Sequence, residues 1–159
     1  MLFGLDKDEL NAYSALATAI IALLALTIAY IQMCVNKKEA RFAVAKGIYK
    51  DYLTLAFDNP EFSSASYPLN APRLQTFSFD DDKYERYEFF VSYLLFAAEE
   101  ILVLTKNSQA WRATLSDQLR YHALYLDTQD FPEHHYSSDL LTLREEAITA
   151  YKESKEGNG

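Results

Sequence analysis

The stretch that decides the fold is AYSALATAIIALLALTIAYIQMCVNKKEAR, residues 12–41. Its first 24 residues, Ala12 to Val35, contain no charged residue, histidine, proline or glycine, and the composition changes abruptly at Asn36. As a helix rising ~1.5 Å per residue this run is about 36 Å long, which is enough to cross a hydrocarbon core of ~30 Å. The sequence therefore predicts a transmembrane helix over residues 12–35, because helices in soluble cores are typically shorter and amphipathic.

A cleaved signal peptide is the main alternative to a retained anchor. Such a peptide has a positive n-region, an apolar stretch of about 7–15 residues and a cleavage site with small residues. Here residues 1–11 carry a net charge of −2, from Lys7 against Asp6, Asp8 and Glu9, and the apolar run is longer. The segment IQMCVNKK, residues 31–38, has no small-x-small pattern. We therefore expect the helix to remain as an anchor.

The charged flanks of the anchor predict its orientation. Lys7 is the only basic residue before the run, whereas five follow it closely: Lys37, Lys38, Arg41, Lys46 and Lys50. The positive-inside rule places such a flank in the cytoplasm. We therefore expect a single-pass protein of the inner cell membrane, with its N-terminus outside. The five basic residues are also suited to anionic lipid head groups.

One face of the predicted anchor carries only small side chains. They recur at spacings of 4, 4, 3 and 4, and they are Ser14, Thr18, Ala22, Ala25 and Ala29. A smooth face of this kind allows a second helix to approach closely within the bilayer. The pattern indicates a helix–helix contact with a larger membrane protein complex or with another copy of this chain.

The rest of the chain is typical of an all-α fold. A helical stalk is predicted over residues 36–57, an acidic helical domain over 58–153 and a flexible tail over 154–159. Within the domain, helices are predicted over about 82–106, from Asn107 or Ser108 to about 127, and from Ser137 or Ser138 onward. The sequence thus predicts one N-terminal transmembrane helix continuing into a small bundle of three to four helices.

A loop with two prolines, SSASYPLNAPRLQTFSFD, precedes the helix that is expected near residue 82. Loops of this length are uncommon inside a compact domain and are often functional. The sequence therefore favours residues 62–80 as a recognition or switching segment.

Charge and motif content exclude several classes of function. Residues 51–159 carry a net charge of −10, which disfavours nucleic acid as a partner because phosphate binding requires a basic surface. The single cysteine, Cys34, excludes an internal disulfide framework, and no glycine-rich phosphate loop or G-x-S-x-G motif is present. The DFPEHHY segment contains Asp130, Glu133, His134 and His135, but adjacent loop histidines point in different directions. We therefore expect no cofactor, no metal and no catalytic residue.

Two polar residues fall among the apolar positions of neighbouring helices. Glu99 lies at the edge of one apolar stripe, and His122 continues the stripe formed by Trp111, Leu115 and Leu119. If the two helices form an antiparallel hairpin, Glu99 and His122 come together as a structural hydrogen bond or ion pair. Catalysis by this pair requires a cleft that the sequence does not reveal.

The chain resembles a family of bacterial single-pass membrane proteins with one N-terminal membrane helix and a small helical cytoplasmic domain. The resemblance is carried by the apolar span, by DNPEF at 58–62, by the Glu99-bearing helix, by Trp111 and by YLDTQDF at 125–131. It implies this architecture, and it implies no catalytic residue.

Together, these features favour a non-enzymatic, membrane-anchored accessory or assembly subunit. Its anchor would pack on a membrane partner, and its acidic domain would offer a docking surface. A membrane-tethered sensor or effector in signalling or defence is the first alternative, and a membrane-bound enzyme using histidine and acidic residues is the second.

Overall fold

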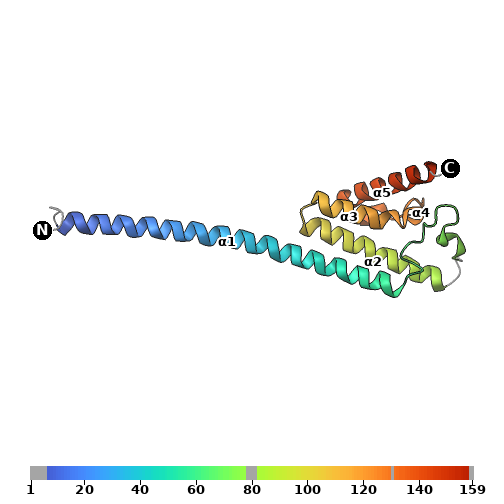
Figure 1. The fold of residues 1–159 in the computed structure, drawn as a ribbon, viewed down its shortest axis with the longest axis horizontal. Helices are drawn as coiled ribbons and strands as arrows, with labels where there is room; N and C mark the ends of the chain where they lie inside the picture. Colours follow the sequence, from blue (N-terminus) through green and yellow to red (C-terminus); the bar gives the residue numbers. More distant parts are fainter. Residues whose placement is uncertain (1–6, 78–81, 130, 158–159) are drawn as a thin grey trace. The chain divides into compact units, whose positions relative to one another are not determined.

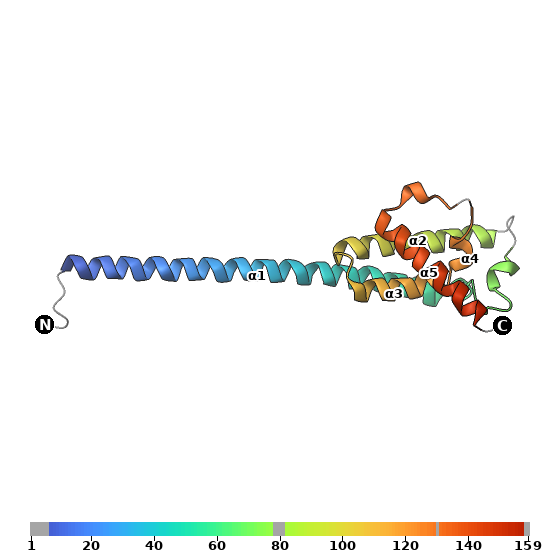
Figure 2. The same cartoon turned by 90° about the horizontal axis from the view of Figure 1, so that it is seen from above.

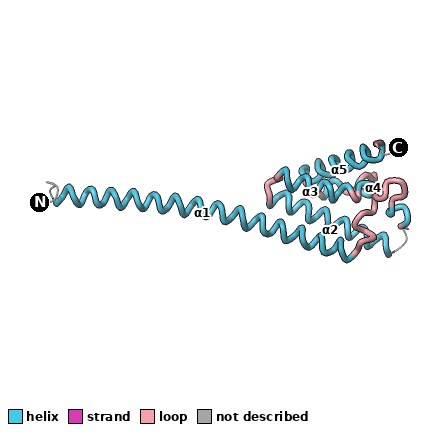
Figure 3. The backbone as a smooth tube through the Cα atoms, viewed as in Figure 1, coloured by secondary structure: helices cyan, strands magenta, loops and turns pink. Residues whose placement is uncertain are grey.

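The computed structural model describes residues 7–77, 82–129 and 131–157 (Figure 1). Every regular element in this part of the chain is helical, and none of it is strand (Figure 3). A long apolar N-terminal helix is followed by a small helical domain, so the predicted fold class is confirmed.

The first helix, α1, runs from Lys7 to Asp58. Its first turn carries Asp8 and Glu9, which interact favourably with the positive end of the helix dipole. Hydroxyl groups in its apolar part bond back to the helix itself: Thr18 Oγ1 donates to the carbonyl oxygen of Ser14 at 2.8 Å, and Thr27 Oγ1 donates to that of Leu23 at 2.8 Å. Such internal pairing suits surroundings without water, because the hydroxyls of Thr18 and Thr27 are satisfied within the helix.

The chain forms two compact units, residues 1–40 and residues 41–159. The boundary lies inside α1 and inside the predicted stalk. Residues 41–58 therefore belong to the helical domain. By length and composition, α1 is the one helix in the described residues that can cross a membrane, and none of its most apolar 18-residue window is buried.

The helical domain contains the end of α1 and four further α-helices: α2 (Asp82–Leu104), α3 (Gln109–Arg120), α4 (Ala123–Leu126) and α5 (Ser138–Glu156). Two short 3₁₀ helices, η1 (Arg73–Thr76) and η2 (Glu133–His135), lie in the connections. Helix α5 packs against α2, α3 and α4, and α2 also packs against α3 (Figures 1 and 2).

A tight turn joins α2 to α3. Lys106 and Asn107 both adopt the left-handed conformation, with φ of 54° and 55°, and the backbone N–H of Asn107 donates to the carbonyl oxygen of Leu102 at 2.7 Å. This bond satisfies one of the carbonyl groups left over at the end of α2, and asparagine tolerates the left-handed region better than most residues do.

Aromatic rings hold the last turns of α1 to the rest of the domain. The ring of Tyr52 lies 5.9 Å from that of Phe90 on α2, and the ring of Tyr49 lies 5.6 Å from that of Trp111 on α3. Phe62, just beyond α1, contacts Phe90 and Tyr87 at 6.0 and 5.9 Å. Ring pairs at these separations stabilise packing beyond their buried area.

Three details differ from the sequence prediction. Residues 62–77 include buried side chains, among them Phe62, Ala65 and Phe77, so this part of the predicted loop belongs to the core; residues 78–80 lie outside the described part. The helix expected up to about residue 127 is interrupted at Tyr121 and His122, between α3 and α4. Helix α5 continues to Glu156, past the start of the predicted tail.

Candidate functional site

Among the described residues, His122 is the only histidine in the core of the domain. Its side chain is fully buried at the start of α4, and its Nδ1 atom shares a hydrogen bond of 3.0 Å with the hydroxyl of Tyr87 on α2. The ring of Phe90 lies 5.6 Å away, and Nε2 has no hydrogen-bond partner in the described part of the chain. The pair is therefore enclosed by aromatic side chains.

Burial determines the protonation of both members of this pair. It lowers the pKa of His122 to about 3, because the charged imidazolium is disfavoured without water. Burial also raises the pKa of the Tyr87 hydroxyl far above its ordinary value. Both side chains are neutral at physiological pH. This favours a structural hydrogen bond over proton transfer, which works best with a pKa near the working pH.

Glu99 and His122 do not form the direct pair that the sequence analysis predicted. Glu99 Oε1 accepts a hydrogen bond of 2.7 Å from the backbone N–H of Ser137, which is the N-cap residue of α5. Because His122 bonds Tyr87, each residue has its own structural partner. The helix spacing identified both residues as structural, but the sequence contained no signal for Tyr87 or Ser137 as their partners.

The connection that contains the two adjacent histidines is held by an arginine. Arg144 on α5 is almost fully buried; its Nε donates to the carbonyl oxygen of Leu126 at 2.8 Å, and its guanidinium lies 4.3 Å from the centre of the Phe131 ring. A terminal nitrogen of Arg144 also contacts Glu133 at 3.0 Å. Glu133 is thus already paired. The described residues contain no group of three or more potential ligands arranged for a metal ion, and Asp130 lies outside them.

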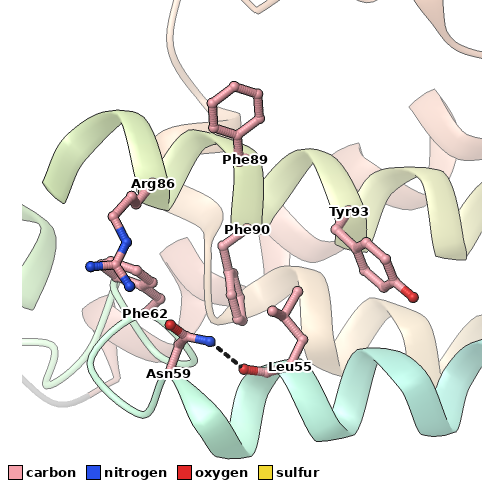
Figure 4. A pocket seen from close by; sticks show the side chains of 7 residues that line it. All are labelled: Leu55, Asn59, Phe62, Arg86, Phe89, Phe90 and Tyr93. Atoms are coloured by element: carbon pink, nitrogen blue, oxygen red, sulfur yellow. Dashed lines mark hydrogen bonds between the residues drawn. The ribbon is translucent and has the colours of Figure 1, made fainter. Parts of the chain in front are cut away.

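An open groove lies between the end of α1 and α2 (Figure 4). It has a volume of about 390 Å³, and its lining residues are Leu55, Asn59, Phe62, Arg86, Phe89, Phe90 and Tyr93. Phe90 projects from α2 toward the α1 side, and Phe89 projects the opposite way. The side-chain amide of Asn59 donates to the carbonyl oxygen of Leu55 at 2.9 Å, so this polar group is already engaged. The groove is mainly aromatic.

Arg86 is the charged residue of the groove. Its guanidinium carbon lies 5.9 Å from the centre of the Phe62 ring, and no salt bridge to it is found in the described residues. Arginine and aromatic side chains are the types that dominate binding energy at protein interfaces. The groove and the neighbouring exposed side of α2 are therefore the best candidate interaction surface of the domain. The helical spacing of Phe89, Tyr93 and Phe96 is the sequence signal for this surface, but it does not by itself distinguish an exposed face from a buried one.

The structure exposes every residue that the sequence assigned to the membrane contact. The small side chains Ser14, Thr18, Ala22, Ala25 and Ala29 all lie uncovered on α1, as do the basic side chains Lys37, Lys38, Arg41, Lys46 and Lys50. Cys34 is also exposed. Both groups are therefore accessible to a lipid or to a partner helix.

Comparison with known proteins gives no match: neither a family model, nor a curated protein, nor a solved structure is significantly similar to this chain.

Proposed function

We propose that this chain is a non-enzymatic, membrane-anchored accessory or assembly subunit. In this proposal the apolar part of α1 crosses the inner cell membrane and packs on a membrane protein partner, and the acidic domain on its cytoplasmic side presents a docking surface. The observation that carries the proposal is the apolar stretch of α1, which is uncovered throughout its length. Helices of this kind are stable in lipid, where every backbone group is paired within the helix.

Two features of the domain support a binding role over a catalytic one. His122 is buried and neutral beside Tyr87, and Glu99 bonds the start of α5, so both of the predicted polar residues have structural partners. The exposed features of the domain are instead an aromatic groove and a row of aromatic side chains on α2. Surfaces of this composition are typical of protein interfaces.

The switching alternative has less support. Ser66, inside the predicted 62–80 loop, is fully buried; its backbone N–H donates to the carbonyl oxygen of Tyr121 at 2.9 Å, and its carbonyl oxygen accepts from the Tyr151 hydroxyl at 3.0 Å. A segment in which one buried residue is bonded through both its backbone N–H and its carbonyl oxygen has little freedom to rearrange.

Purification in a mild detergent tests the proposed function. We expect a membrane protein partner to copurify in fixed proportion. The double substitution Ala22→Leu with Ala25→Leu should reduce its recovery at least tenfold, because bulky side chains keep a second helix away from the small face. The matched control, Ala12→Leu with Ala19→Leu, adds the same bulk outside that face. A purely monomeric chain, or equal loss in both variants, contradicts the proposal.

A further inference from the structure

We propose that the exposed stripe of α2 is a pairing surface for a second copy of this chain. The stripe consists of Asp82, Arg86, Phe89, Tyr93, Phe96, Glu100 and Val103. All seven residues are exposed, and the spacings between them are 4, 3, 4, 3, 4 and 3. This inference extends the proposed function, because it names one partner of the docking domain.

The spacing of the stripe is the one that helix pairing requires. The apolar members of the stripe, Phe89, Tyr93, Phe96 and Val103, are spaced at 4, 3 and 7 positions, with Glu100 between the last two, so they form a seam on one face of α2. In coiled coils a seam of this period packs against another helix. Along the described part of this chain, α3 and α5 pack on the other side of α2, where Val91, Leu94 and Ile101 are buried. The chain's own helices therefore leave the seam open.

The exposed area of the stripe is sufficient for a weak, specific pair. Phe89 is 68% exposed, Phe96 59% and Val103 63%. With Tyr93, these side chains expose roughly 400 Å² per copy, on the basis that an aromatic residue has about 150–250 Å² to bury. Two copies, with Arg86 and Glu100 at the rim, would remove about 1,000 Å² from water, which is close to the lower limit for specific interfaces.

The shape of the surface suits an interface in which both copies use the same patch. Such an isologous contact uses the same self-complementary patch on both copies. Arg86, Phe89 and Tyr93 of the stripe also line the groove of about 390 Å³, so the stripe and the groove adjoin on α2, while the Phe89 ring points away from the α1 side (Figure 4). Two copies anchored in one membrane also meet at a high effective concentration, so the pair needs little intrinsic affinity.

Disulfide crosslinking of the full chain tests the pairing. In a Cys34→Ser background, Tyr93→Cys places a thiol at the middle of the stripe, where the two copies approach each other whichever way the helices run. In lipid vesicles at a high lipid-to-protein ratio, mild oxidation should crosslink this variant at least ten times faster than Thr149→Cys, an exposed position on α5. Equal rates at the two positions overturn the proposal.

A second substitution separates specific pairing from random collision. Adding Phe96→Glu to the Tyr93→Cys variant should lower the crosslinking rate about tenfold, whereas Phe57→Glu should leave it unchanged. Phe57 is 84% exposed and lies on α1, outside the stripe, so it is a matched control. Circular dichroism verifies that each variant is folded. Equal effects of the two substitutions overturn the proposal.

The direction of the pair can be read from its ends. Arg86→Cys crosslinks to itself if the two α2 helices run in the same direction, and it crosslinks to Glu100→Cys if they run in opposite directions. Either pattern supports the pairing. Because these experiments need no other protein, a missing membrane partner would refute the proposed function without affecting them.

Discussion

At the scale of single residues, the most consequential side chain is the imidazole of His122. Its pKa is about 3 in the folded domain and near 6.5 in the unfolded chain. Between these two pKa values the unfolded state binds more protons than the folded state, so the free energy of unfolding increases with pH. This contribution to stability is lost as the pH falls from about 6.5 toward 3. Burying a neutral histidine thus makes the domain sensitive to acid.

We predict that His122→Gln removes this part of the acid sensitivity. Glutamine does not titrate, so the variant should lose less stability on acidification than the unmodified chain. Between pH 6.5 and pH 3 the difference should be on the order of 4 kcal/mol. Denaturant unfolding at a series of pH values, followed by circular dichroism, measures the difference. His134→Gln is the control, because His134 is exposed. If both variants keep the full pH dependence, His122 is not the group responsible.

Arg144 gives a second prediction at this scale. Arg144→Ala should lower the free energy of unfolding by roughly 2–3 kcal/mol, because it removes charge-assisted hydrogen bonds to Leu126 and Glu133 in a buried setting. It should also speed proteolysis of the connection between α4 and α5. Lys152→Ala breaks an exposed ion pair with Asp127 and should cost no more than ~1 kcal/mol. Equal losses in the two variants would contradict the role of burial.

At the scale of elements, Ser66 connects three segments that are distant in sequence. Beyond its backbone bonds to Tyr121 and Tyr151, its hydroxyl oxygen accepts from the backbone N–H of Leu124 at 3.0 Å. The segment between α1 and α2 is therefore fastened to the α3–α4 junction and to α5. This explains how a stretch that contains two prolines becomes part of the core.

We predict that Ser66→Ala weakens the attachment of this segment to the rest of the domain. It leaves the N–H of Leu124 unsatisfied, which should cost about 1–2 kcal/mol and increase proteolytic cleavage within residues 62–77. Ser63→Ala provides the control, since the bond that its hydroxyl makes within the described residues goes to the nearby carbonyl oxygen of Pro60. Cleavage that is equally slow in both variants would show that the hydroxyl of Ser66 contributes little.

The helices were predictable from local sequence signals, and their partners were not. The N-cap at Ser137, the end of α1 before Pro60 and the start of α2 at Asp82 all follow from capping and turn residues. The burial of Phe62 and Ser66 could not be predicted, because it depends on residues farther along the chain. Phe62 packs on Tyr87 and Phe90. Ser66 bonds to Tyr121 and Tyr151. The Tyr87–His122 bond joins positions 35 residues apart, and helical periodicity gives no register between separate helices.

The position of the candidate groove could not be predicted from the sequence either. Arg86, Phe89 and Tyr93 follow helical spacing, but the same spacing is typical of a buried face. That α2 buries Val91 and Leu94 and exposes Phe89 and Phe96 was determined by which side α5 and α3 cover. A helix with apolar residues all round is ambiguous until its neighbours are known.

At the scale of the whole molecule, the proposed orientation gives a prediction of its own. In a Cys34→Ser background, a cysteine at Asn11 should react with a membrane-impermeant maleimide in intact bacterial cells. A cysteine at Thr149 should react only after permeabilisation, because the basic residues after the span keep that side inside. The Cys34→Ser chain without an added cysteine is the control for background labelling. The reverse labelling pattern would refute the proposed topology.

The contact between Tyr151 and Ser66 also has a consequence for biosynthesis. The two residues are separated by 85 positions. At ~5–20 residues per second, the ribosome reaches Tyr151 on the order of 4–17 s after it has added Ser66. During that interval the aromatic segment before α2 lacks its final partner and is open to chaperones and proteases, while the apolar helix is already available for insertion. In the proposed topology, delivery to the membrane can therefore precede completion of the domain, and a ribosome stalled before Tyr151 would leave an inserted but unfinished protein.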